Sequence, residues 1–407
     1  MISRPAYTQQ LRLFIDKPQV KILTGIRRSG KSTVLRLLRE ELLSGGVKQE
    51  QVVLINLESF IHSELNTVPR LYEYVSSQIQ KGKKYYLLLD EIQEVDAWEK
   101  AVNAFLVDFD VDIYLTGSNS HLLSSELATY LAGRYVEIPV YTLSFTEFLE
   151  FRKHYFPGEF QSSKDAFLRY LRSGGFPVIH TANYYDDAAY KVVYDIYSSV
   201  ILRDTVQRYK IRDVELLERV VKYAFDNIGN TFSGKNVADY FKSQQRKIDV
   251  NTVYNYLNAL EGAFILYRVP RYDMKGREVL KTQEKFYISD VSLLYATMGF
   301  RDRMIAGILE NIVFLELKRR GYKVYVGKSD NKEIDFIAEK QNEKIYVQVA
   351  YKLDSEQTVE REFSTLVSVA DQHPKFVVTL DDLWQDSIEG VRHIHIVDFL
   401  QKEVFHN

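Results

Sequence analysis

The sequence predicts an α/β protein of several domains, the first of which is a P-loop parallel sheet with helices on both faces. Short β-branched, apolar runs alternate with helical stretches between residues 19 and 140, as in parallel sheets that are buried on both sides. A glycine-rich loop joins the first run to a helix. Beyond residue 144 the pattern is helical, and from residue 305 it is mixed α/β again. We therefore expect a helical segment, a winged helix and a second α/β domain after the sheet.

The composition is that of a globular protein and excludes several kinds of site. The 407 residues are long for one domain, and the formal net charge is −2. Nucleic acid would therefore have to bind a local basic patch rather than a global basic field. The lack of cysteine excludes disulfides, zinc–thiolate sites and thiol catalysis. Because no signal-like N-terminus and no run of 18 apolar residues occurs, we expect a soluble cytoplasmic protein with no membrane partner.

Five runs are the predicted strands of the first domain. The stretch KSTVLRLLREELLSGG follows the first run, has leucines at helical spacing and ends at a glycine pair, so it is the predicted helix after the loop. The strands are VKILT at 20–24, VVLIN at 52–56, YYLLLD at 85–90, DIYLT at 112–116 and VEIPV at 136–140.

The loop between the first strand and this helix has the G-x-x-x-x-G-K-S pattern of a phosphate-binding loop. Gly25 and Gly30 let the backbone curl so that N–H groups point inward at a helix N-terminus. Lys31 would reach the β- and γ-phosphates, and the Ser32 hydroxyl would bind Mg²⁺. The alternative, a coincidental glycine-rich turn, does not explain the strand before it and the helix after it. The predicted ATP-binding residues are Gly25, Ile26, Arg27, Arg28, Ser29, Gly30, Lys31, Ser32 and Thr33.

An acidic pair ends the third strand. Asp90 would lie at the carboxyl edge of the sheet, where parallel sheets bind ligands, and would hold Mg²⁺ together with Ser32. Glu91 follows directly, and an acid at this place can orient and deprotonate the attacking water. Together with the loop, the pair predicts hydrolysis of ATP rather than binding alone. A whole strand, residues 52–56, separates the loop from Asp90 in the sequence.

The fourth strand ends in Thr116-Gly117-Ser118-Asn119. A polar side chain here can sense the γ-phosphate, and Ser118 and Asn119 are the candidates. A simple turn is the alternative.

The order of several motifs resembles a family of prokaryotic ATPases, single-chain members of the AAA+/STAND-like group. In that family a winged helix and a restriction-endonuclease-like domain (of the DUF4143 type) follow the ATPase core. The resemblance covers essentially the full length and implies a core at 1–141, a helical lid at 142–210, a winged helix at 211–300 and a degenerate nuclease-like domain at 301–407. The motifs are GIRRSGKST, LLLDEIQ, LTGSNS, LAGRYVEIPVYTLSFTEF, SGGFP and ILRDTVQRY.

The resemblance also implies roles for three further residues. Arg134, in LAGRY, would be an arginine finger supplied to a neighbouring subunit, which implies a homo-oligomer. Pro177, in the GGFP motif of the lid, would lie against adenine. Arg203, in ILRD, would read phosphate from the lid. For either arginine, a solvated or salt-bridged side chain is the alternative.

Residues 213–290 predict three helices and a β-hairpin, the winged-helix arrangement. The third helix, VNTVYNYLNALEGAF, has Asp249 as its expected N-cap, and Asn251, Tyr254 and Asn255 are the polar or aromatic candidates for DNA contact near its start. The hairpin strands, ILYRVPRY and REVLKTQEKFYIS, meet at Asp273-Met274-Lys275-Gly276. The module either contacts DNA phosphates or only packs on the core and relays its state. Nearby basic residues are Lys242, Arg246, Lys247, Arg271, Lys275, Arg277 and Lys281.

The resemblance of the last domain implies a nuclease site with incomplete residues. The family pattern has a helix glutamate, a strand aspartate and an acid-x-lysine strand that bind Mg²⁺ and activate water. Glu310 and Asp335 match the first two, but Gln348 occupies the position of the acid and Ala350 that of the lysine. Lys352 lies two residues further on, on the same strand face. We expect a retained fold with weak or absent cleavage, in which Glu310 and Asp335 bind a metal or only form salt bridges.

These observations lead to one main hypothesis and two alternatives. The main hypothesis is a Mg²⁺-dependent ATPase that binds ATP and ADP and uses ATP as a conformational switch to control DNA or a protein partner. The first alternative is an ATP-gated DNA nuclease that uses the C-terminal domain. The second is a nucleotide-dependent binding protein that does not contact DNA.

Overall fold

The computed structural model describes residues 2–120, 131, 133–184, 186–244, 248–280, 283–299, 304–329, 332–382 and 387–405. The chain divides into two compact units. The first unit comprises Met1–Tyr141 and Gly262–Phe264, and the second comprises Thr142–Glu261 and Ile265–Asn407. The finer borders expected at 210 and 300 stay predictions.

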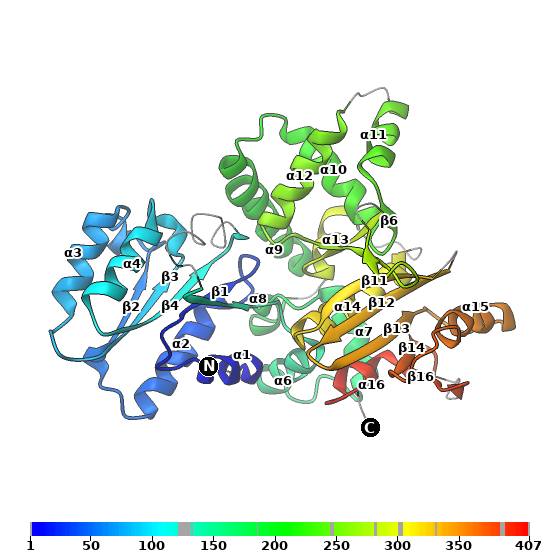
Figure 1. The fold of residues 1–407 in the computed structure, drawn as a ribbon, viewed down its shortest axis with the longest axis horizontal. Helices are drawn as coiled ribbons and strands as arrows, with labels where there is room; N and C mark the ends of the chain where they lie inside the picture. Colours follow the sequence, from blue (N-terminus) through cyan, green and yellow to red (C-terminus); the bar gives the residue numbers. More distant parts are fainter. Residues whose placement is uncertain are drawn as a thin grey trace. The chain divides into compact units, whose positions relative to one another are not determined.

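The first unit is built on a five-stranded parallel sheet in the order β2-β3-β4-β1-β5. The five predicted strands are confirmed to within one residue at each end. Strand β4, and not β2, separates β1 from β3 in the sheet, and β2 is an edge strand (Figure 1). The strands are β1 (Val20–Thr24), β2 (Val52–Asn56), β3 (Tyr85–Asp90), β4 (Val111–Gly117) and β5 (Tyr135–Pro139).

Helices cover both faces of this sheet because successive strand residues point to opposite sides. Leu87 and Leu89 of β3 belong to one apolar core, and Leu88 and Tyr86 belong to the other. The first core includes Leu71 and Phe105 and their neighbours from α3 and α4, and the second is filled from α1 and α2. The helices are α1 (Pro5–Arg12), α2 (Lys31–Ser44), α3 (Val68–Gln78) and α4 (Trp98–Asp108), with short 3₁₀ turns η1 (Gln49–Gln51), η2 (Phe60–His62) and η3 (Ile92–Glu94).

The second unit begins with helices. One of them continues from α9 as a π-helix, η5 (Val200–Gln207), where the sequence pattern predicted an ordinary helix. The Thr205 hydroxyl donates to the Val200 carbonyl, five residues back, at 3.2 Å. Such segments are rare overall and are frequent at functional sites. The other helices here are α6 (Phe145–Tyr155), α7 (Ser163–Ser173), α8 (Pro177–Thr181) and α9 (Asp186–Ser199).

A helix–strand–helix–helix–strand–strand module follows, in the order that a winged helix has. Strand β10 pairs with both β6 and β7 in a three-stranded sheet. Asp249 caps α12 as predicted, because its carboxylate accepts the Asn251 N–H at 2.8 Å. The elements are α10 (Val214–Asp226), β6 (Thr231–Phe232), α11 (Gly234–Ser243), α12 (Val250–Gly262), β7 (Leu266–Val269) and β10 (Glu284–Ile288).

The predicted wing differs from the structure at its tip. The first hairpin strand breaks at Pro270, which has no N–H to donate to a neighbouring strand. Beyond the break, β8 (Arg271–Asp273) and β9 (Glu278–Val279) pair with each other, and β8 also pairs in parallel with β11 of the C-terminal sheet. The tip of the hairpin is therefore the edge of the C-terminal sheet and not a free wing.

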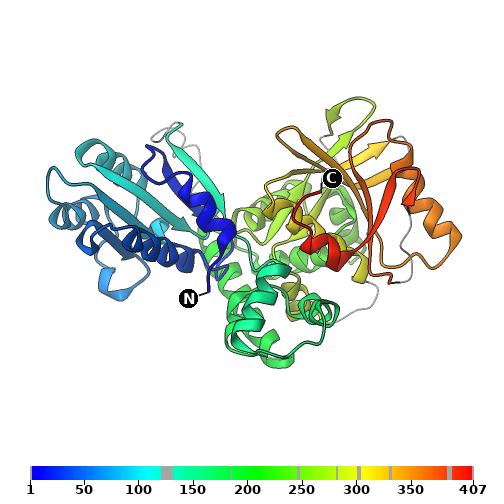
Figure 2. The same cartoon turned by 90° about the horizontal axis from the view of Figure 1, so that it is seen from below.

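The C-terminal part of the second unit contains an eight-stranded mixed sheet in the order β15-β16-β14-β13-β12-β11-β8-β9. Helices α15 and α16 contact β14 and β16 from opposite sides (Figure 2): Phe376 of β14 meets Phe399 of α16, whereas Val377 lies in the core beneath α15. The remaining elements are α13 (Val291–Met298), α14 (Ile305–Arg319), β11 (Lys323–Ser329), β12 (Lys332–Lys340), β13 (Glu343–Val349), α15 (Glu356–Val367), β14 (Lys375–Thr379), β15 (Ser387–Ile388), β16 (Val391–His395) and α16 (Ile396–Gln401). In the part of the chain that the structure describes, no helix has both the length and the apolar composition needed to span a bilayer.

Candidate functional site

The glycine-rich loop lies between β1 and α2, as the sequence predicted. Gly25 has φ +141°, and a Cβ atom there would be 2.2 Å from the carbonyl oxygen of Val140, so a side chain has no room. Gly30 has φ +101° and is the N-cap of α2. The loop therefore runs into a helix N-terminus, where backbone N–H groups and the helix dipole favour an anion.

Lys31, the first residue of α2, lies across the loop. Its side chain is buried, and Nζ donates to the carbonyl oxygens of Gly25 at 2.9 Å and Ile26 at 3.1 Å. The ammonium group is therefore held on the loop itself, beside the helix N-terminus where phosphates would bind.

The other loop residues differ from Lys31 and from one another in burial. Ile26 and Ser29 are buried, Ser32 and Thr33 are half-buried, and Arg28 is exposed. Arg27 forms an ion pair with Glu58 at 3.0 Å.

Asp90, at the end of β3, is the centre of a polar network that joins three strands and α2. Its Oδ1 accepts from the Thr116 hydroxyl at 2.6 Å and from the Ser32 hydroxyl at 3.0 Å. Its Oδ2 accepts from Asn56 at 3.3 Å. The predicted partners Ser32 and Asp90 are thus brought together, 58 residues apart in the sequence.

The electrostatics of Asp90 favour a bound cation. The side chain is 3% exposed, and burial raises its pKa, while the hydrogen bonds from Thr116 and Ser32 lower it. All three donors to Asp90 are neutral groups. Carboxylate and hydroxyl oxygens are the ligands that Mg²⁺ prefers, so Asp90 and Ser32 fit this ion, which would stabilise the charged carboxylate.

Glu91 occupies a strained backbone conformation immediately after β3. It has φ +56° and ψ +52°, a left-handed conformation that costs a non-glycine residue about 1–2 kcal/mol and that is concentrated at functional sites. The Thr116 hydroxyl accepts the Glu91 N–H at 2.8 Å, and the Glu91 carboxylate accepts from Gln93. Thr116 therefore holds the carboxylate of Asp90 and the backbone N–H of Glu91.

The two candidate sensor residues after β4 are fully buried. Ser118 and Asn119 each have 0% exposure. The Ser118 hydroxyl has no hydrogen-bond partner within the described residues. Arg134, by contrast, is exposed just before β5, and its carbonyl oxygen accepts the Val20 N–H at 2.7 Å. Its role as a finger stays a prediction.

The other two residues implied by the family resemblance lie in the second unit. Pro177 is half-buried as the first residue of α8, and Arg203 is exposed on the π-helix η5. Their contacts with nucleotide therefore stay predictions.

The glycines before Pro177 have a structural role that the sequence did not indicate. A Cβ atom on Gly174 would lie 1.9 Å from the Asp290 carboxylate. Asp290 Oδ2 also accepts the Gly175 N–H at 2.8 Å. His180 Nε2 lies 2.9 Å from the Gly174 carbonyl oxygen. The SGGFP turn is thus packed around a buried acid from the end of the winged-helix module.

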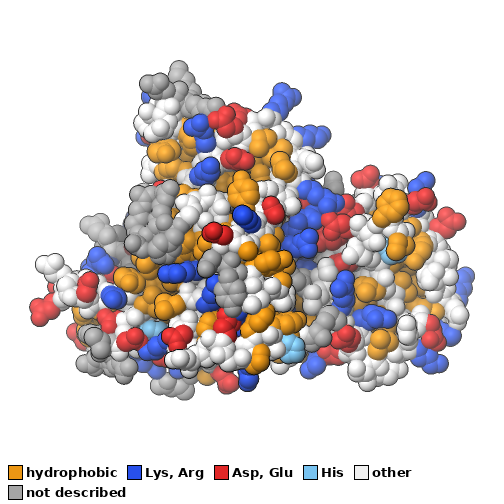
Figure 3. Space-filling model, turned by 180° about the vertical axis from the view of Figure 1, so that it is seen from behind, with side chains coloured by type: hydrophobic (Ala, Val, Ile, Leu, Met, Phe, Trp, Pro, Cys, Tyr) orange, Lys and Arg blue, Asp and Glu red, His pale blue; other side chains and the backbone are white. Residues whose placement is uncertain are grey.

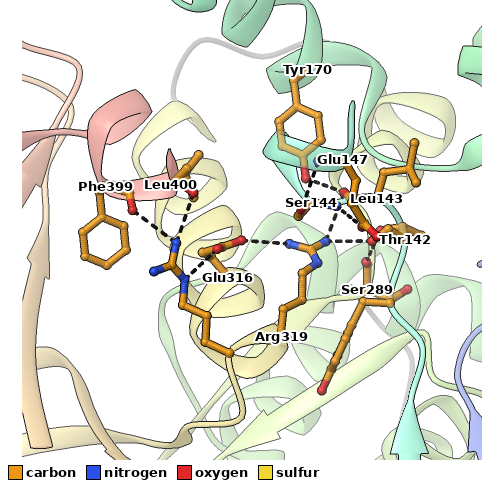
Figure 4. Close-up of polar contacts among 12 residues, drawn as sticks. Thr142, Leu143, Ser144, Glu147, Tyr170, Ser289, Glu316, Arg319, Phe399 and Leu400 are labelled. Atoms are coloured by element: carbon orange, nitrogen blue, oxygen red, sulfur yellow. Dashed lines mark hydrogen bonds and ion pairs between the residues drawn. The ribbon is translucent and has the colours of Figure 1, made fainter. Parts of the chain in front are cut away.

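Helix α14 holds the segment with which the second unit begins (Figure 4). Arg319 donates to the carbonyl oxygens of Thr142 at 3.2 Å and Leu143 at 3.3 Å, and the Thr142 hydroxyl donates to the Ser289 carbonyl at 3.3 Å. Arg319 also lies 3.8 Å from Glu316, which pairs with Arg320 at 2.7 Å. The chain that leaves the first unit is therefore fixed, within two residues, by elements more than 140 residues downstream.

The candidate DNA-contacting residues of the winged-helix module are only partly available. Asn251 and Asn255 are exposed on α12, but Tyr254 packs against the start of α11, where its hydroxyl accepts the Gly234 N–H at 3.3 Å. Arg271 is 11% exposed and pairs with Glu333 of the C-terminal sheet.

The basic residues predicted to lie near α12 are only partly described. Lys242, Lys275 and Arg277 are exposed, whereas Arg246, Lys247 and Lys281 lie outside the described residues. On the face drawn in Figure 3, basic and acidic side chains lie side by side.

The predicted nuclease residues Glu310 and Asp335 do come together, beside a lysine from another element. Val326 of β11 faces both Asp335 and Phe336 at a register shift, a β-bulge that turns both side chains toward the same face. Lys285 Nζ, from β10, lies 2.8 Å from Glu310 and 3.4 Å from Asp335. The Tyr287 hydroxyl also donates to Glu310.

The ammonium group of Lys285 forms ion pairs with the carboxylates of this cluster. Lys285 is 2% exposed and also contacts Glu333 at 2.8 Å. Burial lowers the pKa of its ammonium group, but the three nearby acids raise it more. Lys285 is therefore charged. Gln348 accepts the Asp335 N–H at 3.3 Å, Ala350 is buried and Lys352 is exposed. Among the residues with a defined position, no group of three or more acids or histidines could hold a metal ion.

Three residues of the nucleotide site were missed from the sequence. Asn56, the last residue of β2, and Thr116, the last but one of β4, contact Asp90, and a polar residue near the end of a buried parallel strand was the available signal. Arg4, which contacts the loop from before α1, had no such signal.

Comparison with known proteins places the nucleotide site in an AAA domain. Residues 17–149 match a family model described as an AAA domain, and residues 164–303 match a domain of unknown function (DUF8612). The restriction-endonuclease-like assignment of the C-terminal part stays a prediction. The Walker-type ATPase PABY2304 of Pyrococcus abyssi resembles the chain in fold, with a TM-score of 0.51 and 15% identity over 73% of this chain and 96% of its own.

Two proteins are similar over most of the sequence. An uncharacterized protein of Haemophilus influenzae is 38% identical over 401 residues, which are 98% of each chain. The uncharacterized protein MJ1544 of Methanocaldococcus jannaschii is 30% identical over 369 residues, 87% of this chain and 78% of its own. The chain belongs to the same family as these two proteins, and its first unit is a P-loop AAA domain.

Proposed function

We propose that the chain is a Mg²⁺-dependent ATPase. The observation that carries the proposal is the Ser32–Asp90–Thr116 network, which joins the phosphate-binding loop to the carboxyl edge of the sheet. In this proposal the loop binds the phosphates, Lys31 neutralises them, and Ser32 and Asp90 hold Mg²⁺. The ion would neutralise the charge that develops on the transferred phosphate.

Glu91 would orient and deprotonate the attacking water. Its carboxylate follows the Mg²⁺-binding acid by one residue, and the left-handed backbone together with the Thr116 hydrogen bond fixes where its side chain starts. Asn119, buried at the end of β4, would sense the γ-phosphate. Pro177 and Arg203 would contact adenine and phosphate from the lid.

The output of hydrolysis would be a change in the posture of the second unit. The supporting observation is that Arg319 fixes Thr142 and Leu143, the first residues of the second unit, within that unit. We infer that the controlled partner is DNA or a protein, and that the working form is a homo-oligomer in which Arg134 completes a neighbouring site.

Steady-state turnover tests the hydrolytic assignment. Glu91→Gln should bind ATP with little change but hydrolyse it at least about 100-fold more slowly, which is the lower contribution of a general base. Lys31→Ala should lose ATP affinity as well. Arg36→Ala, at an exposed position of α2 beyond the loop, is the control for a non-specific effect of removing a positive charge near the site.

Two results would overturn the proposal: no turnover by the wild type with Mg²⁺ present, or full turnover by Glu91→Gln. Particle size measured with and without ATP tests the role of Arg134. If assembly and turnover are both unchanged in Arg134→Ala, the finger is lost from the proposal while the ATPase remains.

A further inference from the structure

Arg4 is a buried cation that contacts the phosphate-binding loop from outside the motif. Its side chain is 1% exposed, and its guanidinium lies over the Tyr7 ring at 4.5 Å. Nη1 donates to the Ser29 carbonyl oxygen at 2.8 Å, and Nη2 donates to the Tyr141 carbonyl oxygen at 3.0 Å. Burying a guanidinium is costly, and these two hydrogen bonds offset part of that cost while they hold one peptide group of the loop and one just beyond β5.

The contact with Ser29 fixes the orientation of a peptide group in the loop. A peptide is planar and trans, so its C=O and the N–H of the next residue point in opposite directions. Since Arg4 holds the Ser29 carbonyl, the Gly30 N–H must point away from Arg4. Gly30 is the N-cap of α2, and an N–H at this place is among those that receive a bound anion.

The contact with Tyr141 fixes the other side of the loop. Val140 N donates to the Thr24 carbonyl at 2.7 Å, and the Val140 carbonyl fills the space where Gly25 would carry a Cβ atom. The Tyr7 hydroxyl accepts the Tyr141 N–H at 3.0 Å. The start of α1 therefore connects the late part of the loop, at Ser29, with the strand end that abuts its first glycine.

We propose that Arg4 is a positioning residue for nucleotide binding: it holds the Ser29–Gly30 peptide so that the Gly30 N–H faces the nucleotide phosphates. This inference rests on the proposed ATPase function. It predicts that removing Arg4 weakens the binding of nucleotide phosphates by more than any loss of stability explains. Without Arg4 the Ser29–Gly30 peptide can rotate, and the loop then presents one N–H donor fewer to the phosphates.

The variants Arg4→Met and Arg4→Lys separate positioning from packing. Methionine removes both hydrogen bonds, whereas lysine keeps a cation that can reach one carbonyl. Arg12→Met, which removes an exposed arginine of the same helix that pairs with Glu41, is the matched control. Each variant is melted first, and KM for ATP, kcat and calorimetric affinity for Mg²⁺-ADP are measured at a temperature where all variants are folded.

We expect Arg4→Met to raise KM and weaken ADP binding by about tenfold, the effect of one hydrogen bond from a charged group, with a smaller change in kcat. Arg4→Lys should be intermediate and Arg12→Met unchanged. If Arg4→Met, and with it Arg4→Lys, lowers the melting temperature but leaves KM and ADP affinity as in wild type, Arg4 is only structural and the inference is wrong. If wild type binds ADP but shows no turnover, only the ATPase proposal fails; if it binds no ADP, both fail.

Discussion

Asp90 in the first unit and the pair Glu310 and Asp335 in the second are all buried acids, yet their charges are handled in opposite ways. The donors to Asp90 are two hydroxyls and an amide. The acids of the second unit surround the ammonium of Lys285. A buried carboxylate whose hydrogen-bond donors are neutral has no direct ion pair to compensate its charge, whereas a carboxylate paired with lysine has one. The comparison indicates a ligand site in the first unit and a structural cluster in the second.

The strongest test of this comparison is Lys285→Met. Breaking a buried ion pair by removing one partner costs about 3–5 kcal/mol, because an uncompensated charge remains. We expect urea unfolding to show a loss at the lower end of this range, since protonation of Asp335, whose pKa burial already raises, relieves part of the cost. Adding Glu310→Gln should recover part of it. A loss below about 1 kcal/mol would mean that the cluster is not held by its lysine.

The same variant also tests the nuclease alternative. In Lys285→Met the two acids are free to bind an ion, so Mn²⁺ should raise the melting temperature of the variant and not that of the wild type. Wild-type cutting of plasmid DNA with Mn²⁺, abolished by Asp335→Ala, would contradict this expectation and revive the ATP-gated nuclease.

His180 adds a third case to these two groups of buried acids, because it is a titratable side chain that is buried in its neutral form. Burial lowers its pKa from 6.5 to about 3, and Arg152 and Arg169 add to the effect. Since the unfolded chain takes up the proton first, stability is lost as the pH falls below 6.5; the loss should be about 2 kcal/mol between pH 7.5 and pH 5. Urea unfolding at both values measures it, and His180→Gln should have a flatter dependence. Equal slopes would place the titrating group elsewhere.

Asp90→Asn should have the smallest effect on stability. Burial already disfavours the charged carboxylate, so its removal should leave the unfolding free energy without nucleotide within about 1 kcal/mol of wild type. The melting shift caused by Mg²⁺-ATP should nevertheless be lost. Stability falling as far as in Lys285→Met would show that Asp90 is a structural acid too, and the contrast between the two sites would not hold.

Local patterns gave most of the first unit correctly. Its five strands are short, apolar and separated by turn residues, and the loop motif is contiguous, so neighbouring residues are enough to locate them. Ser32 and Asp90 could be joined because carboxyl ends of parallel strands share one edge. The strand that lies between β1 and β3 was not identified, since sheet order depends on contacts that the sequence pattern does not contain.

The residues that were missed act over long sequence distances or through backbone irregularities. Arg4 reaches Tyr141, and Lys285 reaches Asp335, 50 residues on. The bulge at Asp335 leaves no mark in the alternation of that strand. The break at Pro270 was missed as well, although a proline inside a predicted strand argues against a continuous ladder.

The hydrogen bonds from Arg319 to Thr142 and Leu143 have a consequence for folding during synthesis. All five strands of the first sheet have been synthesised by residue 139. The turn at Gly174 and Gly175, by contrast, waits for Asp290, and the start of the second unit waits for Arg319. During synthesis all strands of the first sheet therefore leave the ribosome well before the helices that follow them can complete their contacts. Chains cut after η5 should expose these helices as a target for proteases.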